Sequence, residues 1–306
     1  MITTKRIAPT IAALAIVAAG CSSADIAATV NDSEITESFA LSIRASNADR
    51  LTVSGEEFRN DLSRLIFTQA MMVAAEEDFG LTDMDSQEAR DAYRATISPA
   101  EQGFLDSIAA DPSFTEAAVD VATTQLMLRD GVRRALGQDQ EIAEEIWQND
   151  QESLVQVCAS HILVQTEEEA NVVFTRLTAG EDFAAVAQEV SLDTQSPGGA
   201  LPCPASPAEF VGSFGTAVAA APVGEPTGPV QTEFGYHIIL VDSNESPASL
   251  DEMMSDPVAW IPADILDSYW NMWLNEVVER AEISVRSDIG MWYPPVDGII
   301  PPPSSP

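Results

Sequence analysis

The chain has 306 residues, with 49 acidic and 14 basic side chains and a formal net charge of −35 at pH 7. So acidic a protein repels phosphate, which excludes nucleic acid as a partner, and its body is repelled by anionic lipid headgroups as well. The length suffices for two domains. The three cysteines and two histidines show no close metal-ligand spacing, so no metal site is predicted.

The first 20 residues are predicted to be an export signal. Lys5 and Arg6 precede an apolar stretch, residues 7–19, that is too short to span a bilayer. The stretch leads into Gly20 and Cys21, and small residues directly before a cysteine resemble a bacterial lipobox. We expect cleavage before Cys21, lipidation of that residue and an extracytoplasmic, membrane-anchored lipoprotein. The alternative is an ordinary signal peptide with an accidental cysteine.

Residues 25–150 are predicted to be mostly helical, after a strand, a turn and a strand within 28–36. A capping box of Ser54 and Glu57 indicates the start of the first long helix. Its apolar face repeats at helical spacing: Phe58, Leu62, Leu65, Ile66 and Ala70. Further helices are expected near 86–96, 99–110, 113–135 and 140–150.

Residues 155–243 change character and predict an α+β arrangement, with helices packed on a sheet. The expected order is strand 156–164, helices 167–179 and 182–190, a Gly/Pro-rich loop 191–206, helix 207–220, and strands 228–231 and 236–242. His161 and His237 are the only histidines, and each lies near the start of an apolar, β-branched strand. We therefore expect the two histidines to meet on adjacent strands.

Residues 250–293 return to helix and strand. A broad apolar stripe that includes Trp270 and Trp273 runs along a predicted helix over 263–281 and has to be buried. Its simplest partner is the N-terminal helical region, with a strand at 283–285 beside residues 28–30. The proline-rich tail, 294–306, is predicted to be disordered.

Six strings within 158–242 occur in the order found in one known family. They are Ser160–Val164, Leu177–Phe183, Ser191–Ser196, Gly198–Leu201, Gly228–Val230 and Thr232–Ile239. Together they resemble a parvulin, a peptidyl-prolyl isomerase domain. The resemblance implies a four-stranded antiparallel sheet with helices, inserted in a mostly helical SurA-N-like chaperone domain. The split arrangement and the lipobox resemble SurA- and PrsA-type foldases of bacterial envelopes.

The resemblance also implies roles for single residues. His161 and His237 match a hydrogen-bonded histidine pair beneath the substrate, and Asp193 matches a position near the twisting carbonyl. Thr232 matches a hydroxyl of the same network. The substrate-binding positions are Leu201, Phe210 and Phe214 in an apolar proline pocket, with Phe234 at its rim. The alternatives are a histidine pair that only orders the sheet, and phenylalanines that are ordinary core.

The loop over 199–204 departs from the family pattern, Gly-Gly-Asp-Leu-Gly-aromatic. Here Ala200 replaces the acidic residue, and two prolines stiffen the loop. Once Cys21 is set aside, Cys158 and Cys203 are an even pair in an exported protein, which favours a disulfide. An acidic run at 167–169 stands where some parvulins carry a basic cluster, so selection of phosphorylated substrates is not expected.

The predicted function is that of a lipid-anchored foldase, a parvulin-type peptidyl-prolyl cis-trans isomerase. It would isomerise Xaa-Pro bonds in exported proteins and bind unfolded or partly folded clients, with the membrane reached through the lipid anchor and no cofactor implied. The altered loop keeps a second reading open, a non-catalytic holdase chaperone with a silent parvulin domain. A purely structural envelope lipoprotein is a third reading, without a positive feature in its favour.

Overall fold

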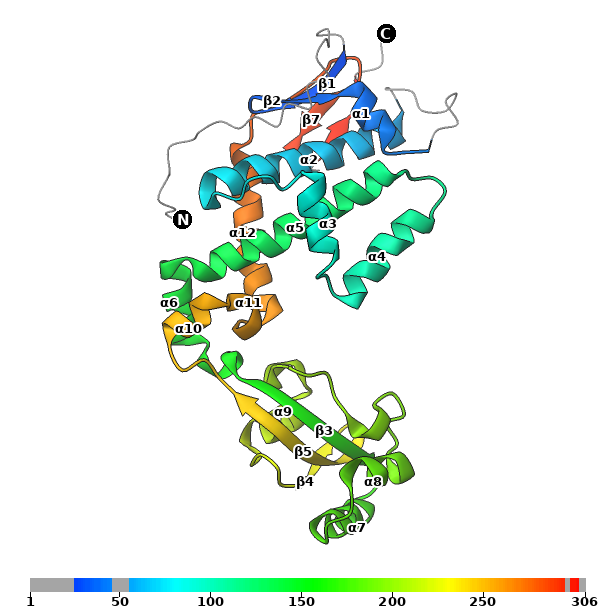
Figure 1. Ribbon diagram of the computed structural model, residues 1–306, viewed down its shortest axis with the longest axis vertical. Helices are drawn as coiled ribbons and strands as arrows, with labels where there is room; N and C mark the ends of the chain where they lie inside the picture. Colours follow the sequence, from blue (N-terminus) through cyan, green and yellow to red (C-terminus); the bar gives the residue numbers. More distant parts are fainter. Residues whose placement is uncertain (1–24, 46–54, 295–297, 303–306) are drawn as a thin grey trace. The chain divides into compact units, whose positions relative to one another are not determined.

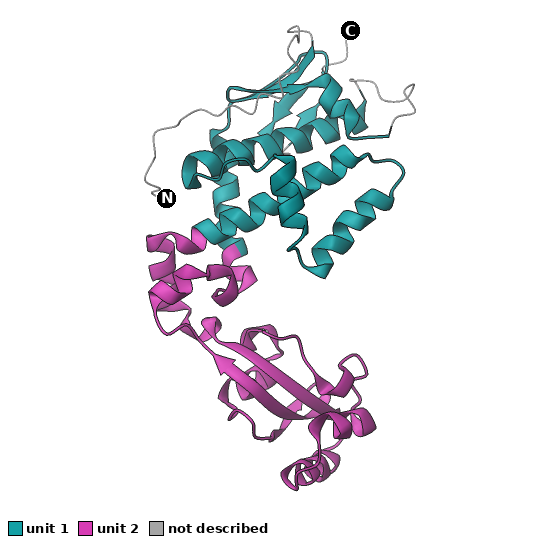
Figure 2. Cartoon of the chain, viewed as in Figure 1, with its two compact units in different colours: residues 1–135, 267–306 teal, residues 136–266 magenta. Residues whose placement is uncertain are grey.

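The computed structural model describes residues 25–45, 55–294 and 298–302 (Figure 1). The chain divides into two compact units, residues 1–135 with 267–306, and residues 136–266 (Figure 2). The first unit is therefore assembled from both ends of the chain, and the second is one continuous segment. The division falls inside two helices, α5 (Glu116–Gln138) and α12 (Ala263–Arg280). The expected lipidation site, Cys21, lies outside the described residues.

A small antiparallel sheet joins the two ends of the chain in the first unit. Its order is β2 (Ser33–Thr36), β1 (Ile26–Val30) and β6 (Ile283–Val285). The backbone pairs Ala28 with Val285 and Val30 with Ile283. The predicted pairing of strand 283–285 with residues 28–30 is thus confirmed.

The N-terminal part of the first unit is otherwise built of helices. They are α1 (Glu37–Ser42), α2 (Glu56–Phe79), α3 (Gln87–Arg94), α4 (Pro99–Ala110) and most of α5. All five apolar residues predicted for the face of α2 are buried. Its start differs from the prediction, because Gly55 occupies the N-cap and gives no side-chain hydrogen bond. Ser54 lies outside the described residues, so the expected capping box is not part of the described helix.

Helix α12 completes the first unit through one side of its aromatic stripe. Trp273 is buried, its Nε1 donates to Asp78 Oδ2 at 2.7 Å, and its ring centroid lies 5.8 Å from that of Phe79 at the end of α2. The neighbouring Trp270 and Leu274 are only half-buried. The stripe therefore packs on α2 along one edge and leaves apolar surface along the other.

One part of the predicted tail forms a strand. Strands β7 (Met291–Tyr293) and β8 (Gly298–Ile300) pair antiparallel, so the expected disorder over 294–306 is wrong for residues 298–300. The two isoleucines of β8 favour a strand, but the proline-rich composition around them led to a prediction of disorder. The Ile299 N–H also donates to Ser63 Oγ on α2 at 3.1 Å.

The second unit, all of whose residues are described, contains an antiparallel sheet in the order β3-β5-β4. Its strands are β3 (Gln156–Val164), β4 (Thr227–Thr232) and β5 (Gly235–Glu245). The α+β class is confirmed, but the sheet has three strands rather than the predicted four. Residues 200–205 run beside β3 and pair with it only at isolated bridges. Pro202 and Pro204 lack the N–H groups that a continuous ladder requires.

Helices cover both faces of this sheet. Ile162, Val164 and Ile238 pack against α7 (Glu167–Thr178) and α8 (Phe183–Val190). On the other face, Val157, Ala159, Ile239 and Val241 pack against α9 (Gly212–Ala220). The remaining helices of the unit are α6 (Gln140–Asn149), α10 (Leu250–Ser255) and α11 (Pro257–Trp260), with short turns at Gln151–Leu154, Pro197–Gly199 and Pro207–Glu209.

The predicted helix 207–220 is broken into two pieces. A single turn at Pro207–Glu209 is followed by extended backbone at Phe210 and Val211, and α9 begins at Gly212. The break folds the turn back onto α9, where a Cβ on Gly215 would lie 2.3 Å from the Pro207 carbonyl oxygen. Glycine is required at that approach. Across residues 25–45, 55–294 and 298–302, no helix is both long and apolar enough to cross a bilayer.

Candidate active site

The two histidines meet, as the sequence predicts. In the register of β3 and β5, His161 stands opposite Ile239, and His237 stands opposite Leu163. Both side chains therefore point to the sheet face that α9 covers. Their Nδ1 atoms are 3.1 Å apart and their rings are stacked, with centroids separated by 5.3 Å. Their exposed fractions are 7% and 4%, so the pair is shielded from water.

Each histidine has a polar partner at its outer nitrogen. Asp193 Oδ2 lies 2.7 Å from His161 Nε2, and Thr232 Oγ1 lies 2.8 Å from His237 Nε2. Asp193 comes from the loop after α8, whereas Thr232 ends β4. We call this series of four residues, Asp193, His161, His237 and Thr232, the histidine chain.

Asp193 is held in its ionised form. The Ser196 hydroxyl donates to Oδ2 at 2.7 Å and the Gln195 N–H donates to Oδ1 at 2.9 Å. The hydrogen bonds from Ser196 and then His161 lower the pKa of Asp193 to about 2. Neither Ser196 nor Ser191, whose Oγ accepts from the N–H groups of Leu163 and Asp193, was predicted as a site residue. The short spacing of these serines around the aspartate is the signal that identifies them.

The protons of the histidine chain have one consistent direction. Ionised Asp193 only accepts, so the Nε2 of His161 carries a proton. With both rings neutral, the bare Nδ1 of His161 accepts from the Nδ1–H of His237. The remaining nitrogen of His237 then accepts from the Thr232 hydroxyl, which is oriented because its oxygen accepts the Phe234 N–H at 3.1 Å. Burial, and then the nearby His161, lower the pKa of His237 to about 4, which favours this neutral arrangement.

Leu201, Phe210 and Phe214, which we call the apolar wall, lie beside the histidine chain. The Phe214 ring on α9 presents an edge-on contact to both histidines, with centroids 5.6 Å from His161 and 5.0 Å from His237. Phe210 lies 5.5 Å from Phe214, and Leu201 packs against the same cluster. Phe234, by contrast, is 56% exposed. The structure thus brings Leu201, Phe210 and Phe214 together and leaves Phe234 at the surface.

The loop that carries Leu201 approaches β3 very closely. Gly199 has a φ of 82°, and a Cβ at this position would lie 2.4 Å from the His161 carbonyl oxygen. Only glycine allows both the left-handed backbone and this approach. The glycine therefore brings Leu201 against the strand that carries the first histidine.

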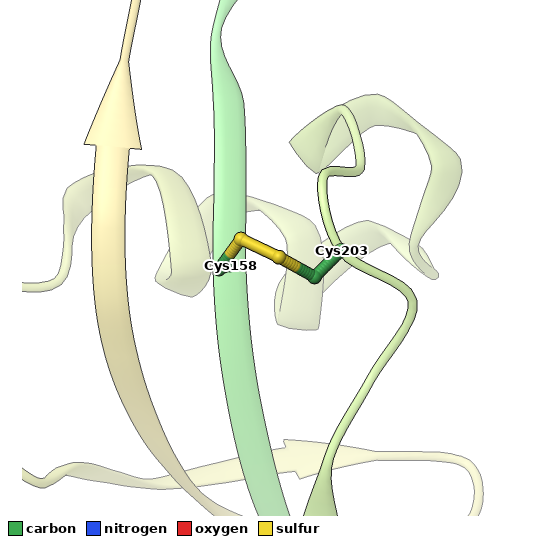
Figure 3. Close-up of a disulfide and its surroundings, with 2 residues drawn as sticks. All are labelled: Cys158 and Cys203. Carbon is green, nitrogen blue, oxygen red and sulfur yellow. A yellow bond between two sulfur atoms is a disulfide. The ribbon is translucent and has the colours of Figure 1, made fainter.

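Cys158 and Cys203 are joined by a disulfide, as predicted (Figure 3). Cys158 lies on β3, three residues before His161, and Cys203 lies in the loop that follows Leu201 (Figure 3). The Cα atoms of the two cysteines are 4.8 Å apart. The disulfide therefore ties the apolar wall to the strand of the histidine chain.

Comparison with known proteins assigns this region to a class. Residues 159–243 match the family model described as a PPIC-type PPIASE domain, or Rotamase. A segment of 89 residues is 49% identical to the foldase protein PrsA of Clostridium botulinum and covers 28% of this chain and 26% of that protein. A segment of 140 residues is 35% identical to the foldase protein PrsA of Halalkalibacterium halodurans and covers 45% of this chain and 40% of that protein.

Among solved structures, the peptidylprolyl isomerase PrsA of Bacillus anthracis aligns with 72% of this chain and 96% of its own, at 18% identity and a TM-score of 0.35. The sequence matches to the two curated relatives span about a quarter and two fifths of those proteins. The family match contains the whole histidine chain and the apolar wall. The resemblance to a parvulin-type isomerase domain is therefore confirmed for residues 159–243.

Proposed function

We propose that residues 155–243 catalyse cis-trans isomerisation of Xaa-Pro peptide bonds, using the histidine chain and the apolar wall. The observation that supports this most directly is the hydrogen-bonded series from Asp193 to Thr232, which runs through two buried histidines beside Phe214. Partial double-bond character makes rotation about a peptide bond cost about 18–20 kcal/mol. Catalysis therefore has to stabilise the twisted amide over both planar forms, without breaking a bond.

The apolar wall supplies one part of that stabilisation. Leu201, Phe210 and Phe214 form a surface of the right chemistry for a proline ring. Excluding water there disfavours the charge-separated resonance form that keeps the amide planar. The twisted amide has less charge separation, so it loses less in an apolar site.

The histidine chain supplies the second part. Asp193 is ionised, and in this proposal the substrate carbonyl lies next to its carboxylate. A negative field disfavours the planar form, in which the carbonyl oxygen carries more negative charge. His161 donates one hydrogen bond to this carboxylate, and two further hydrogen bonds, to His237 and from there to Thr232, fix the ring of His161 in turn. In this role the histidines position the aspartate and shape the floor of the site.

We further propose that the helical unit, residues 25–150 completed by residues 250–293, binds unfolded or partly folded clients. A cleft of about 1190 Å³ in this unit is lined by Phe67, Leu274, Val278, Ile283, Val285, Met291 and Trp292, among others. Half-buried aliphatic and aromatic side chains are suited to unfolded segments, which expose similar side chains. The chain would act as an extracytoplasmic foldase, lipid-anchored through Cys21 after removal of residues 1–20.

The test of the enzyme is a protease-free assay of a short Xaa-Pro peptide with the full chain. We expect isomerisation well above the spontaneous rate, which takes tens of seconds or longer. A background rate would refute the enzyme. If the same preparation still suppresses aggregation of an unfolded protein, the chain would be a non-catalytic holdase. The sequence feature that favours this alternative is Ala200, which replaces the acidic residue of the family.

The client-binding part has its own test. Leu274→Asp places a charge in the cleft, so suppression of aggregation should fall several-fold while peptide isomerisation stays unchanged. Met272→Asp is the matched control, because Met272 is 47% exposed on the same helix but does not line the cleft. Equal losses in both variants would contradict a role for the cleft.

A further inference from the structure

The segment that carries Leu201 is attached to β3 in an unusual way. Ala200 bridges to Ser160 at one end, and Ala205 bridges to Val157 at the other. Between these bridges, residues 201–204 lie beside only Cys158 and Ala159 of β3, so the segment arches outward. We call residues 200–205 the arch.

Backbone hydrogen bonds hold the ends of the arch only. The Leu201 N–H donates to the Ala159 carbonyl at 3.1 Å, and Ala205 and Val157 exchange two bonds of 3.0 and 2.9 Å. Between these ends, Pro202 and Pro204 have no N–H to donate. A normal edge strand would add ladder bonds here, and they would fix the position of the neighbouring side chains.

The disulfide occupies the gap in the ladder. It joins Cys203, in the middle of the arch, to Cys158 on the neighbouring strand β3 (Figure 3). Leu201 lies two residues away, and its side chain packs with Phe210 against the cluster of the apolar wall. Fixing the arch therefore fixes one side of the proposed proline pocket.

We propose that the Cys158–Cys203 disulfide is a positioning link for substrate binding: it replaces the missing ladder bonds and holds Leu201 in the proline pocket. The proposal rests on the proposed isomerase function, and it assigns to the cysteines an effect on peptide binding beyond their effect on stability. Cys203 is exposed and Cys158 is half-buried, so a small dithiol can reach the bond. Reduction by a dithiol gives two thiols and oxidises the dithiol to its own disulfide.

The test compares oxidised wild type with the double variant Cys158→Ser/Cys203→Ser, both as the full chain. Steady-state isomerisation of a short Xaa-Pro peptide should show a KM raised about five- to tenfold in the variant, with kcat changed less than twofold. Dithiothreitol should raise the KM of the wild type to the same level, and reoxidation should restore it. The variant should not respond to dithiothreitol.

A matched control separates positioning from stability. Val186→Ala removes buried volume on the opposite face of the sheet, where Val186 packs with Ile162 and Val173. It should lower the melting temperature as well but leave KM unchanged. If the cysteine variant loses stability with an unchanged KM, the disulfide contributes only to stability and the proposal is wrong.

A second readout remains valid if the chain proves not to be an isomerase. Hydrogen exchange should be at least tenfold faster at the Leu201 amide in the reduced protein. The Leu192 amide, which donates to the Leu163 carbonyl at 2.8 Å, should exchange at an unchanged rate. Fast exchange at Leu201 without any isomerisation would refute the proposed isomerase activity. It would leave only the claim that the disulfide fixes the position of the arch. Equal exchange in both redox states would overturn the positioning link itself.

Discussion

The two units of this chain pair their charged and titratable groups in different ways. In the first unit, charged side chains form closed ion pairs: Arg44 with the buried Asp61 at 2.5 Å, and the half-buried Arg94 with the half-buried Asp120 at 2.7 Å. In the second unit, the buried histidines pass one direction of hydrogen bonding from Thr232 to Asp193. A closed pair neutralises charge, whereas this series ends on a carboxylate that is still partly accessible.

The apolar surfaces of the two units differ in how completely they are packed. In the second unit, Phe214 is packed against both histidines and is 4% exposed, so the wall has one fixed form. In the first unit, Trp270 and Leu274 remain half-buried, and Leu274 lines a large cleft. A fixed wall suits recognition of one ring, and an open apolar surface suits varied segments. The difference supports a division of labour between catalysis and client binding.

The largest expected effect comes from removing the C-terminal half of the first unit. Deleting residues 267–306 takes Trp273 and Val277 out of its core and β6 away from β1. The free energy lost with these buried side chains is comparable to the whole unfolding free energy of an ordinary domain. We expect the first unit to lose its cooperative thermal transition, while peptide isomerisation by the second unit persists. A retained transition would contradict the assembly of the first unit from both ends of the chain.

The next effect is a pH dependence of the second unit. Unfolded His237 takes up a proton near pH 6.5, whereas the folded residue, with a pKa of about 4, does so only at lower pH. The unfolded state therefore binds more protons between these two pH values. The contribution of His237 to the free energy of unfolding is fully present above about pH 6.5 and is lost as the pH falls to about 4. The loss should be on the order of 3 kcal/mol.

The measurement is the free energy of unfolding of wild type and His237→Asn between pH 7 and pH 4. The variant should show a clearly shallower slope, because the titrating ring is gone. Asp193 does not interfere, since its pKa of about 2 confines its own loss of stability to a range below about pH 3.8. Parallel slopes would mean that His237 is not held neutral by burial.

A smaller effect is expected at the apolar wall. Phe210→Ala opens the proline pocket to water, and kcat/KM for a Xaa-Pro peptide should fall about tenfold, equivalent to about 1.4 kcal/mol of transition-state stabilisation. Phe183→Ala makes the same change on the opposite face of the sheet, where Phe183 packs on the α7 and α8 side. With both proteins assayed below their melting temperatures, only Phe210→Ala should be slow. Equal rates would place Phe210 in the ordinary core.

The smallest effect concerns the rim. Phe234 is 56% exposed and makes no ring contact with the wall among the described aromatic pairs. Phe234→Ala should therefore change kcat/KM for a short peptide by less than twofold. A tenfold loss would show that the rim closes over the substrate, and would extend the fixed wall to the surface.

Much of the second unit is predictable from local sequence. The apolar and β-branched residues that follow His161 and His237 predict both strands, whereas the register of β3 and β5 decides that both histidines lie on one face. The helical spacing in α2 predicts its buried face. The pairing of Cys158 with Cys203 followed from an even count in a protein that its sequence predicts to be exported.

The sequence by itself determined which side chains lie on the same face of one helix or strand, and which family the middle segment resembles, because both depend on short-range spacing. Tertiary structure alone decided the direction of the histidine chain, which requires Ser196 to fix Asp193 and burial to keep His237 neutral. It also decided that residues 200–205 arch over β3 instead of forming a fourth strand, and that residues 298–300 pair with β7. These outcomes depend on contacts between distant segments, whose energies no local pattern contains.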